Sequence, residues 1–404
     1  MRNQPLSVIT FALVASMAVG CSSEPADVVV PAPVAGEAIP SLHDSSPEDD
    51  AQGAPASSGN DTVDKRTDGA PEMTKVTYFG LPNDGGFPVY LSHLLGTKFH
   101  LFPSVEIKNP AATPQTVVLR GSLQGYTKAE AVATITIQPG QTAKGYFDAT
   151  LDFAALGPIT SQVSANYHIS LETTDGKILN ARTKVMKLLP KNTVLWKGVF
   201  AGSTGLTEKQ AVIGVMTTPH DGKLRVDTLL KEAASYSKYN AMIGYQYHKP
   251  TSTVQDDVSG ANDQVGAVYK ALKARGFNYS SVSEAFFTNA QNIRYPAESL
   301  AVATANCIDG SLVFASVLEA LDMDPFVVFV PGHAFVGVRV GPAGSEAAKS
   351  SLLVETTMLG TADYPAATAR GKEEFIQYVN AKTATVIDVK AMRTKGFLPS
   401  PFPM

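Results

Sequence analysis

Cysteine is scarce in this chain, which has only Cys21 and Cys307 among its 404 residues. So small a number excludes a fold held together by several disulfides. Basic runs with interleaved aromatic residues are also missing, which argues against nucleic acid as a partner. The apolar run from Leu6 to Val19 is too short for a resident transmembrane helix. The two cysteines therefore need separate explanations.

The first twenty residues have the features of a secretory signal. A positively charged start precedes the apolar run, and the small residues Ala18-Val19-Gly20 lead into Cys21. This arrangement resembles the lipobox of bacterial lipoproteins, although Ala18 stands where Leu is usual. The resemblance implies that residues 1–20 are removed and that Cys21 becomes a lipid-modified N-terminus. It also implies an extracytoplasmic envelope protein, and Ser22, in place of a retaining Asp, favours the outer membrane. The alternative is ordinary cleavage beside an incidental cysteine.

Residues 21–73 have the composition of a disordered tether. They are rich in Pro, Ala, Ser and Asp and nearly free of aromatic residues, so they cannot bury enough apolar surface to fold. From Ser22 to Met73 there are eleven Asp or Glu against two Lys or Arg. The tether thus carries a net charge of −9, from 2 − 11, so the acidity of the chain, −4 in total, belongs to the tether. The remaining residues are enough for two domains, which we expect at 74–190 and 191–404.

The first expected domain consists of short strands separated by turns. Pro139-Gly140 suits a tight turn, and Asp175-Gly176 predicts a hairpin. The absence of a long helical pattern favours an antiparallel β-sandwich of immunoglobulin-like kind. His93, His100 and His168 are scattered, and we interpret them as surface or packed residues. The expected strands are Lys98 to Lys108, Thr116 to Leu123, Ala131 to Gln138, Ala143 to Asp148, Asn166 to Glu172 and Ile178 to Leu188.

The second expected domain mixes helices and strands, with helices first. Gln210 to Thr217 is a β-branched run, while apolar spacing predicts the helices Val226 to Tyr239 and Asn262 to Arg275. Asn262 and Gly276 would cap the second of these helices. Pro296 opens a further helix, since proline suits a first helical position.

Cys307 begins a helix that is apolar on every turn. Apolar residues recur every three or four positions from Cys307 to Leu321, which predicts a buried helix. At a helix start, unpaired amide groups and the helix dipole favour a thiolate over a thiol, and the same amides can hold an oxyanion. Cys307 is therefore either buried and inert or kept for its reactivity.

His333 and Glu355 follow on strands. Phe326 to Val330, Ala334 to Val340 and Leu352 to Met358 read as successive strands. If the second hairpin turns about Gly344, His333 and Glu355 become cross-strand neighbours. A thiol, an imidazole that takes its proton and a carboxylate that orients the imidazole are the groups that nucleophilic acyl chemistry requires.

A cysteine that opens a helix, Gly332-His333-Ala334-Phe335-Val336 on a strand and an acid on the next strand resemble the transglutaminase-like superfamily. The resemblance is most specific from Gln291 to Gly360. It implies a papain-like α+β domain with Cys307 as nucleophile and His333 as base. Glu355 stands where the family usually has Asp, and Asp363 is the alternative acid.

The residues around Cys307 separate this chain from the calcium-dependent crosslinking enzymes. Asn306 and Ile308 replace the usual Gln and Trp, and no acidic cluster suggests calcium sites. We therefore expect a bacterial peptidase-like member, or one of undetermined activity, without metal or cofactor. Gln291 and Asn306 are candidate oxyanion donors, with loop or cap roles as the alternative. Asp309 is interpreted as a cap of the first helical turn.

These features predict an envelope lipoprotein that acts on amide bonds of protein or peptide substrates through a thioester. Water would give hydrolysis and an amine would give crosslinking, and the sequence favours neither. A non-catalytic binding or assembly module at the envelope is the alternative, because a fold does not entail activity.

Overall fold

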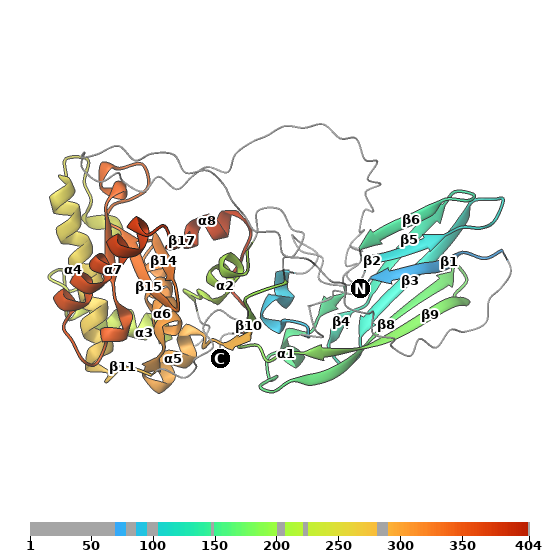
Figure 1. Cartoon of the computed structure of the whole chain (residues 1–404), viewed down its shortest axis with the longest axis horizontal. Coiled ribbons are helices and arrows are strands. Elements are labelled where there is room, and N and C mark those ends of the chain that lie inside the picture. Colours follow the sequence, from blue (N-terminus) through green and yellow to red (C-terminus); the bar gives the residue numbers. More distant parts are fainter. Residues whose placement is uncertain are drawn as a thin grey trace, which may run out of the picture.

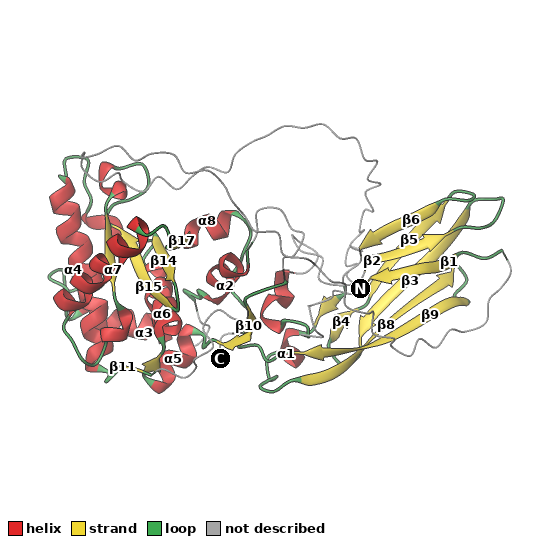
Figure 2. Cartoon of the chain, viewed as in Figure 1, coloured by secondary structure: helices red, strands yellow, loops and turns green. Residues whose placement is uncertain are grey.

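The computed structural model describes residues 69–77, 86–94, 104–146, 149–199, 207–220, 225–280 and 290–402 (Figure 1). Cys21, the signal and nearly all of the tether lie outside these residues, as does His100. Among the described helices, none has the length and apolar character needed to cross a bilayer. The chain is α+β and contains several antiparallel sheets, with strands gathered at one end and helices at the other (Figure 2).

The strand-rich end contains two larger antiparallel sheets, with strand orders β1-β2-β6 and β5-β3-β8-β9. Side chains of both sheets, including Val105, Leu119 and Ile135, line one narrow gap between them. The elements are β1 (Glu72–Thr77), η2 (Val89–Leu94), β2 (Ser104–Lys108), β3 (Gln115–Leu123), β4 (Thr127–Ala129), β5 (Ala131–Ile137), β6 (Thr142–Tyr146), β7 (Thr150–Leu151), α1 (Phe153–Leu156), β8 (Val163–Thr173), β9 (Ile178–Leu188) and β10 (Thr193–Leu195).

The predicted turns have different roles. Gly176, with φ at 90°, lies in the hairpin between β8 and β9, as the sequence predicts. Gly140, with φ at 68°, follows β5 but leads to β6, which belongs to the other sheet. A tight turn that leaves one sheet for the other lets two apolar strand faces meet. The described part of the first predicted strand is β2.

The helix-rich end is built on a four-stranded antiparallel sheet with the order β16-β15-β14-β17. Its elements are α2 (Glu208–Met216), α3 (Arg225–Ala234), η3 (Gly244–Tyr247), α4 (Val254–Ala274), β11 (Asn278–Tyr279), β12 (Ala290–Asn292), α5 (Pro296–Val302), β13 (Thr304–Ala305), α6 (Cys307–Ala320), β14 (Pro325–Val330), β15 (His333–Arg339), η4 (Glu346–Lys349), β16 (Ser351–Val354), η5 (Thr356–Met358), α7 (Tyr364–Asn380), β17 (Thr385–Asp388) and α8 (Val389–Thr394).

The central sheet is covered on both faces. Val327, Phe329 and Val336 belong to the core that also contains the apolar residues of α6. Phe326, Val328 and Phe335, at alternate positions, form a second cluster against Phe375 and Tyr378 of α7. Every residue of β14 is buried, because a strand between two helical layers has no solvent face.

Three expectations about the helices are wrong. The β-branched run at 210–217 is helix α2, which starts with a capping box at Thr207 and Gln210 and is buried from Ala211 to Met216. Burial overrides the weak strand preference of such residues. Helix α4 starts eight residues before Asn262, after a capping box at Thr253. Helices α7 and α8 also follow the strands, so helices are not gathered before them.

The chain's last described residues return to the junction between the two ends. The Lys191 ammonium donates to the carbonyl of Phe402 at 3.2 Å, and the ring of Phe402 packs edge-on against Phe153. His93 lies 2.9 Å from the carbonyl of Leu398, and burial lowers its pKa to about 4. His93 is therefore a packed residue, as the sequence predicts.

Candidate active site

Cys307 is the first residue of α6 and is 1% exposed. The helix starts there because the Asn306 side chain accepts a hydrogen bond from the amide of Asp309 at 2.9 Å. Residues Cys307 to Leu318 are all buried, as expected for a helix that is apolar on every side. The predicted placement of Cys307 at the start of a buried helix is confirmed.

His333 is the first residue of β15. Val330 pairs with His333, so Pro331 and Gly332 form the entire connection between β14 and β15. Gly332 has φ at 70°, the left-handed region that the second central position of a type II turn requires. This tight hairpin fixes the position of the imidazole, and its Nε2 lies 2.7 Å from Oε2 of Glu355.

Glu355 reaches His333 from a different register than the one predicted. Val336 pairs with Val354, which shifts β16 by two residues and removes the direct pairing of His333 with Glu355. The shift arises because η4 occupies the connection in place of a symmetric turn at Gly344. Glu355 also follows β16 and precedes η5 instead of lying within a strand. A shift by two keeps side chains on the same face, so the longer glutamate can reach a diagonal neighbour.

Two glycines allow the chain around Glu355 to pack closely. A Cβ on Gly310 of α6 would lie 2.9 Å from Oγ1 of Thr356, and one on Gly371 of α7 would lie 3.1 Å from the amide nitrogen of Glu355. Helices on either side of the acid can therefore approach its backbone. The amide of Glu355 donates to the carbonyl of Ala367 at 3.0 Å.

Both carboxylate oxygens of Glu355 have partners. Oε2 meets His333, while Oε1 accepts from the amide and the hydroxyl of Thr357 at 2.9 and 2.6 Å. Burial by itself raises the pKa of Glu355, but these hydrogen bonds and the charge of His333 outweigh it and lower the pKa. Glu355 is thus held as a carboxylate at 2% exposure.

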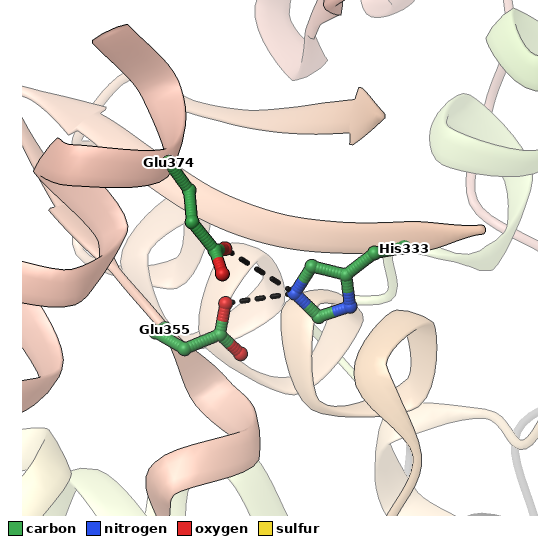
Figure 3. Close-up of side chains that lie close together, drawn as sticks. All are labelled: His333, Glu355 and Glu374. Atoms are coloured by element: carbon green, nitrogen blue, oxygen red, sulfur yellow. Dashed lines mark hydrogen bonds and ion pairs between the residues drawn. The ribbon is translucent and has the colours of Figure 1, made fainter. Parts of the chain in front are cut away.

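The imidazole of His333 interacts with both the acid and the thiol. Burial alone would lower its pKa, but hydrogen bonds with Cys307 and Glu355, together with their charges, raise the pKa to about 10. Nε2 points at two carboxylates in Figure 3, while the other ring nitrogen faces away from them. Nδ1 is therefore the ring nitrogen that remains for a further partner. The structure brings together Cys307, His333 and Glu355.

The sequence did not identify Glu374, the second acid of Figure 3. Its Oε2 is buried, lies 3.6 Å from Nε2 of His333 and has no hydrogen-bond partner within the described residues. Its Oε1 pairs with Arg370 at 2.7 Å. Burial, followed by the neighbouring Glu355 carboxylate, raises the pKa of Glu374. The signal in the sequence is an acidic residue on the buried stripe of α7, a helix that the sequence does not predict.

His333, Glu355 and Glu374 offer donor atoms within 4.8 Å of one another. Within the described residues, this is the group of His, Cys, Asp and Glu side chains that is close enough to hold a metal ion. Hydrogen bonds and ion pairs already engage Nε2 of His333, Oε2 of Glu355 and Oε1 of Glu374. Oε2 of Glu374 has no hydrogen-bond partner within the described residues but lies 3.6 Å from the same Nε2, at ion-pair distance, so the chemistry of the cluster can be derived from its own protons.

The two oxyanion candidates differ in their surroundings. The Gln291 side chain is buried, its Oε1 accepts from the Trp196 indole at 2.9 Å, and its Nε2 has no partner within the described residues. Asn306 uses Oδ1 as the cap of α6. Gln291 therefore carries the buried amide donor that lacks an acceptor, as a donor reserved for a ligand would.

The remaining acids near these residues have structural partners. Asp309 accepts from the amide of Arg294 at 2.9 Å, and burial raises its pKa to about 6. It therefore holds the segment after β12 instead of capping α6. Asp363, the alternative acid, caps α7 through the amide of Ala366.

Tyr245 and Tyr247 pack against the end of the central sheet. Their hydroxyl groups donate to the carbonyls of Arg339 and Val340 at 2.8 and 2.7 Å.

Comparisons of the chain with protein-family models, with curated proteins and with solved structures find no match.

Proposed function

We propose that the protein is a cysteine-dependent enzyme that acts on amide bonds of protein or peptide substrates. Cys307 would be the nucleophile, His333 the base and acid, and Glu355 the residue that orients His333. The single observation that carries this proposal is the 2.7 Å contact between Nε2 of His333 and Oε2 of Glu355, on an imidazole whose pKa the neighbouring Cys307 also raises. This order of groups is the one that nucleophilic catalysis uses.

The chemistry would proceed through a thioester. The Cys307 thiolate attacks the carbonyl carbon of a carboxamide, forming a C–S bond and placing negative charge on the oxygen. Amides at the start of α6 and the Gln291 side chain are the donors for this oxyanion. When the C–N bond breaks, the amine leaves with the proton of His333. Water then gives a proton to His333 and attacks the thioester carbon, and the C–S bond breaks, which releases a carboxylic acid and restores the Cys307 thiolate. An amine in place of water gives a new amide.

A non-catalytic binding or assembly module is the second candidate, and the burial of Cys307 favours it. The thiol is 1% exposed, and a substrate carbonyl must reach it before any bond can form. Catalysis therefore requires an opening motion, as lids and loops provide in many enzymes. A binding module requires none.

Thiol alkylation separates the two candidates. The full chain is treated with iodoacetamide at pH 7, and the label on Cys307 is followed by peptide mapping, which distinguishes it from Cys21. If the protein is an enzyme, Cys307 should be labelled rapidly in the folded state, and His333→Ala should slow that labelling. His168→Ala, on a strand of the other end, is the matched control. Labelling of Cys307 only after denaturation would refute catalysis and favour the module.

We also propose the finer architecture and the location of the protein. The strand-rich end would be an immunoglobulin-like sandwich, and the helix-rich end a transglutaminase-like domain. The sandwich would dock a partner, and the transglutaminase-like domain would carry out the chemistry. Lipidation of Cys21 would tether both to the extracytoplasmic side of a bacterial envelope, with the outer membrane favoured by Ser22. Cys21→Ser should move the protein from the membrane fraction to the soluble fraction. Unchanged fractionation would argue against the anchor.

A further inference from the structure

A groove of about 570 Å³ opens on the α7 side of the central sheet. Its floor includes Phe326 of β14 and Leu353 of β16, and α7 contributes Phe375 and Ile376 to one wall. This volume is in the range of pockets that hold small organic ligands. None of the proposed catalytic residues lines the groove.

The apolar residues of this groove are incompletely covered. Ile376 is 49% exposed, and Leu352 and Phe375 are only part-buried. Removing such surface from water lowers the free energy. Apolar residues gathered in one hollow are a usual feature of ligand-binding sites. The groove therefore favours a ligand with an apolar body.

Both charged side chains that line the groove are basic, namely Arg339 and Lys372. The guanidinium of Arg339 lies 4.9 Å from the ring centre of Phe326 and donates to Oγ of Ser351 at 3.1 Å. In the described part of the chain, no carboxylate lies within ion-pair distance of either cation. Arg339 thus keeps further N–H donors for an anion.

We infer that the groove binds a long-chain carboxylate, a single hydrocarbon chain with one anionic end. The chain lies on the apolar floor, and the carboxylate accepts hydrogen bonds from Arg339 with Lys372 nearby. Such a ligand matches both the basic and the apolar side chains of the groove. The cations gain a counter-charge, and the exposed apolar residues lose contact with water.

Helical spacing separates this groove from the catalytic cluster. Ala367, Gly371 and Glu374 share the stripe of α7 that faces β16 and His333. Thr368 and Lys372 lie on the adjoining stripe and line the groove. Ligand binding is therefore independent of Cys307, so this inference and the proposed function can fail separately.

Calorimetric titration of the full chain with decanoate tests the inference. Decyltrimethylammonium, which has the same chain length and a cationic end, is the matched ligand. Decanoate should bind with one-to-one stoichiometry and at least about 10-fold more tightly than decyltrimethylammonium. Arg339→Gln should lower the affinity for decanoate roughly 10- to 100-fold. Cys307→Ala should leave its affinity unchanged.

Substitutions at exposed positions of α7 locate the site without disturbing the core. Ala369→Trp fills the groove and should abolish binding, while Ala366→Trp, outside the groove on the same helix, should preserve it. Lys372→Gln should weaken binding several-fold, whereas Lys395→Gln, also exposed, should not. Equal affinity for the cationic ligand, or tight binding that survives Ala369→Trp, would overturn the inference.

Discussion

The carboxylate of Glu355 lies 2.7 Å from Nε2 of His333, although the two residues are not cross-strand partners. The contact is still possible because β16 is shifted by two residues from the register in which His333 and Glu355 are direct partners. A shift by an even number of residues keeps every side chain on the same face of the sheet. It also depends on the length of glutamate, since diagonal neighbours on a sheet are farther apart than direct ones. A glutamate at this position, one methylene longer than aspartate, thus has a geometric reason.

Glu355→Gln should slow alkylation or turnover roughly 10²- to 10⁴-fold, the usual share of acid–base catalysis. The amide keeps the size of the side chain but removes the charge that orients and stabilises the imidazolium. Glu355→Asp should also be slow, because the shorter side chain cannot span the diagonal. Rates of iodoacetamide labelling measure both, with exposed Glu346→Gln as control. Wild-type rates in Glu355→Asp would contradict the role of length.

The activity should fall on the alkaline side as His333 loses its proton, with a midpoint near pH 10. The folded pKa of His333 lies above its ordinary 6.5, so its charged contacts stabilise the fold fully below that value and are lost as the pH rises through about 10. NMR titration of the imidazole measures the midpoint. Glu355→Gln should move it downward, and a wild-type midpoint near 6.5 would exclude the charged contacts described here.

Glu374→Gln should stabilise the protein at neutral pH. A buried carboxyl whose folded pKa is raised costs free energy once the pH exceeds its ordinary value of 4.5, because folding then opposes ionisation. Glutamine removes that cost and retains an N–H donor for Glu355. Melting temperatures at pH 7 and pH 4 check this, and the gain should disappear at the lower pH. An equal gain at both values would point to packing instead of charge.

Gly371→Ala tests the close packing of α7 against Glu355. Helix propensity alone would make alanine stabilising by about 1 kcal/mol. The new Cβ would instead press on backbone atoms at 3.1 Å, an overpacking that typically costs about 1–3 kcal/mol. Denaturant unfolding should therefore show a loss of stability, accompanied by slower labelling of Cys307. A gain in stability would mean that α7 moves away freely.

Metal removal should leave alkylation of Cys307 unchanged. Hydrogen bonds and ion pairs engage three of the donor atoms of His333, Glu355 and Glu374, so the proposed steps need only protons. Dialysis against a chelator, followed by the same labelling assay, checks this expectation. If labelling is lost and then returns when a divalent cation is added, the three side chains hold a metal ion instead of the hydrogen bonds described here.

The sequence predicted local features wherever a short pattern had one physical outcome. The apolar spacing after Cys307 predicted α6, and Asp175-Gly176 predicted a hairpin, because both depend on neighbouring residues alone. Where burial competes with propensity the prediction was wrong, as in α2. Helix α7 was not predicted, because its buried stripe of Ala367, Gly371 and Glu374 has little apolar signal.

The sequence by itself determined which groups were available for chemistry, namely one thiol at a helix start, a histidine at a strand start and an acid further along. Only the tertiary structure decided which acid meets the histidine, because the register of β16 depends on the connection that contains η4. It also decided that Glu374 joins them and that Cys307 is buried. Such outcomes depend on contacts between residues far apart in the chain, which no local pattern of residues encodes.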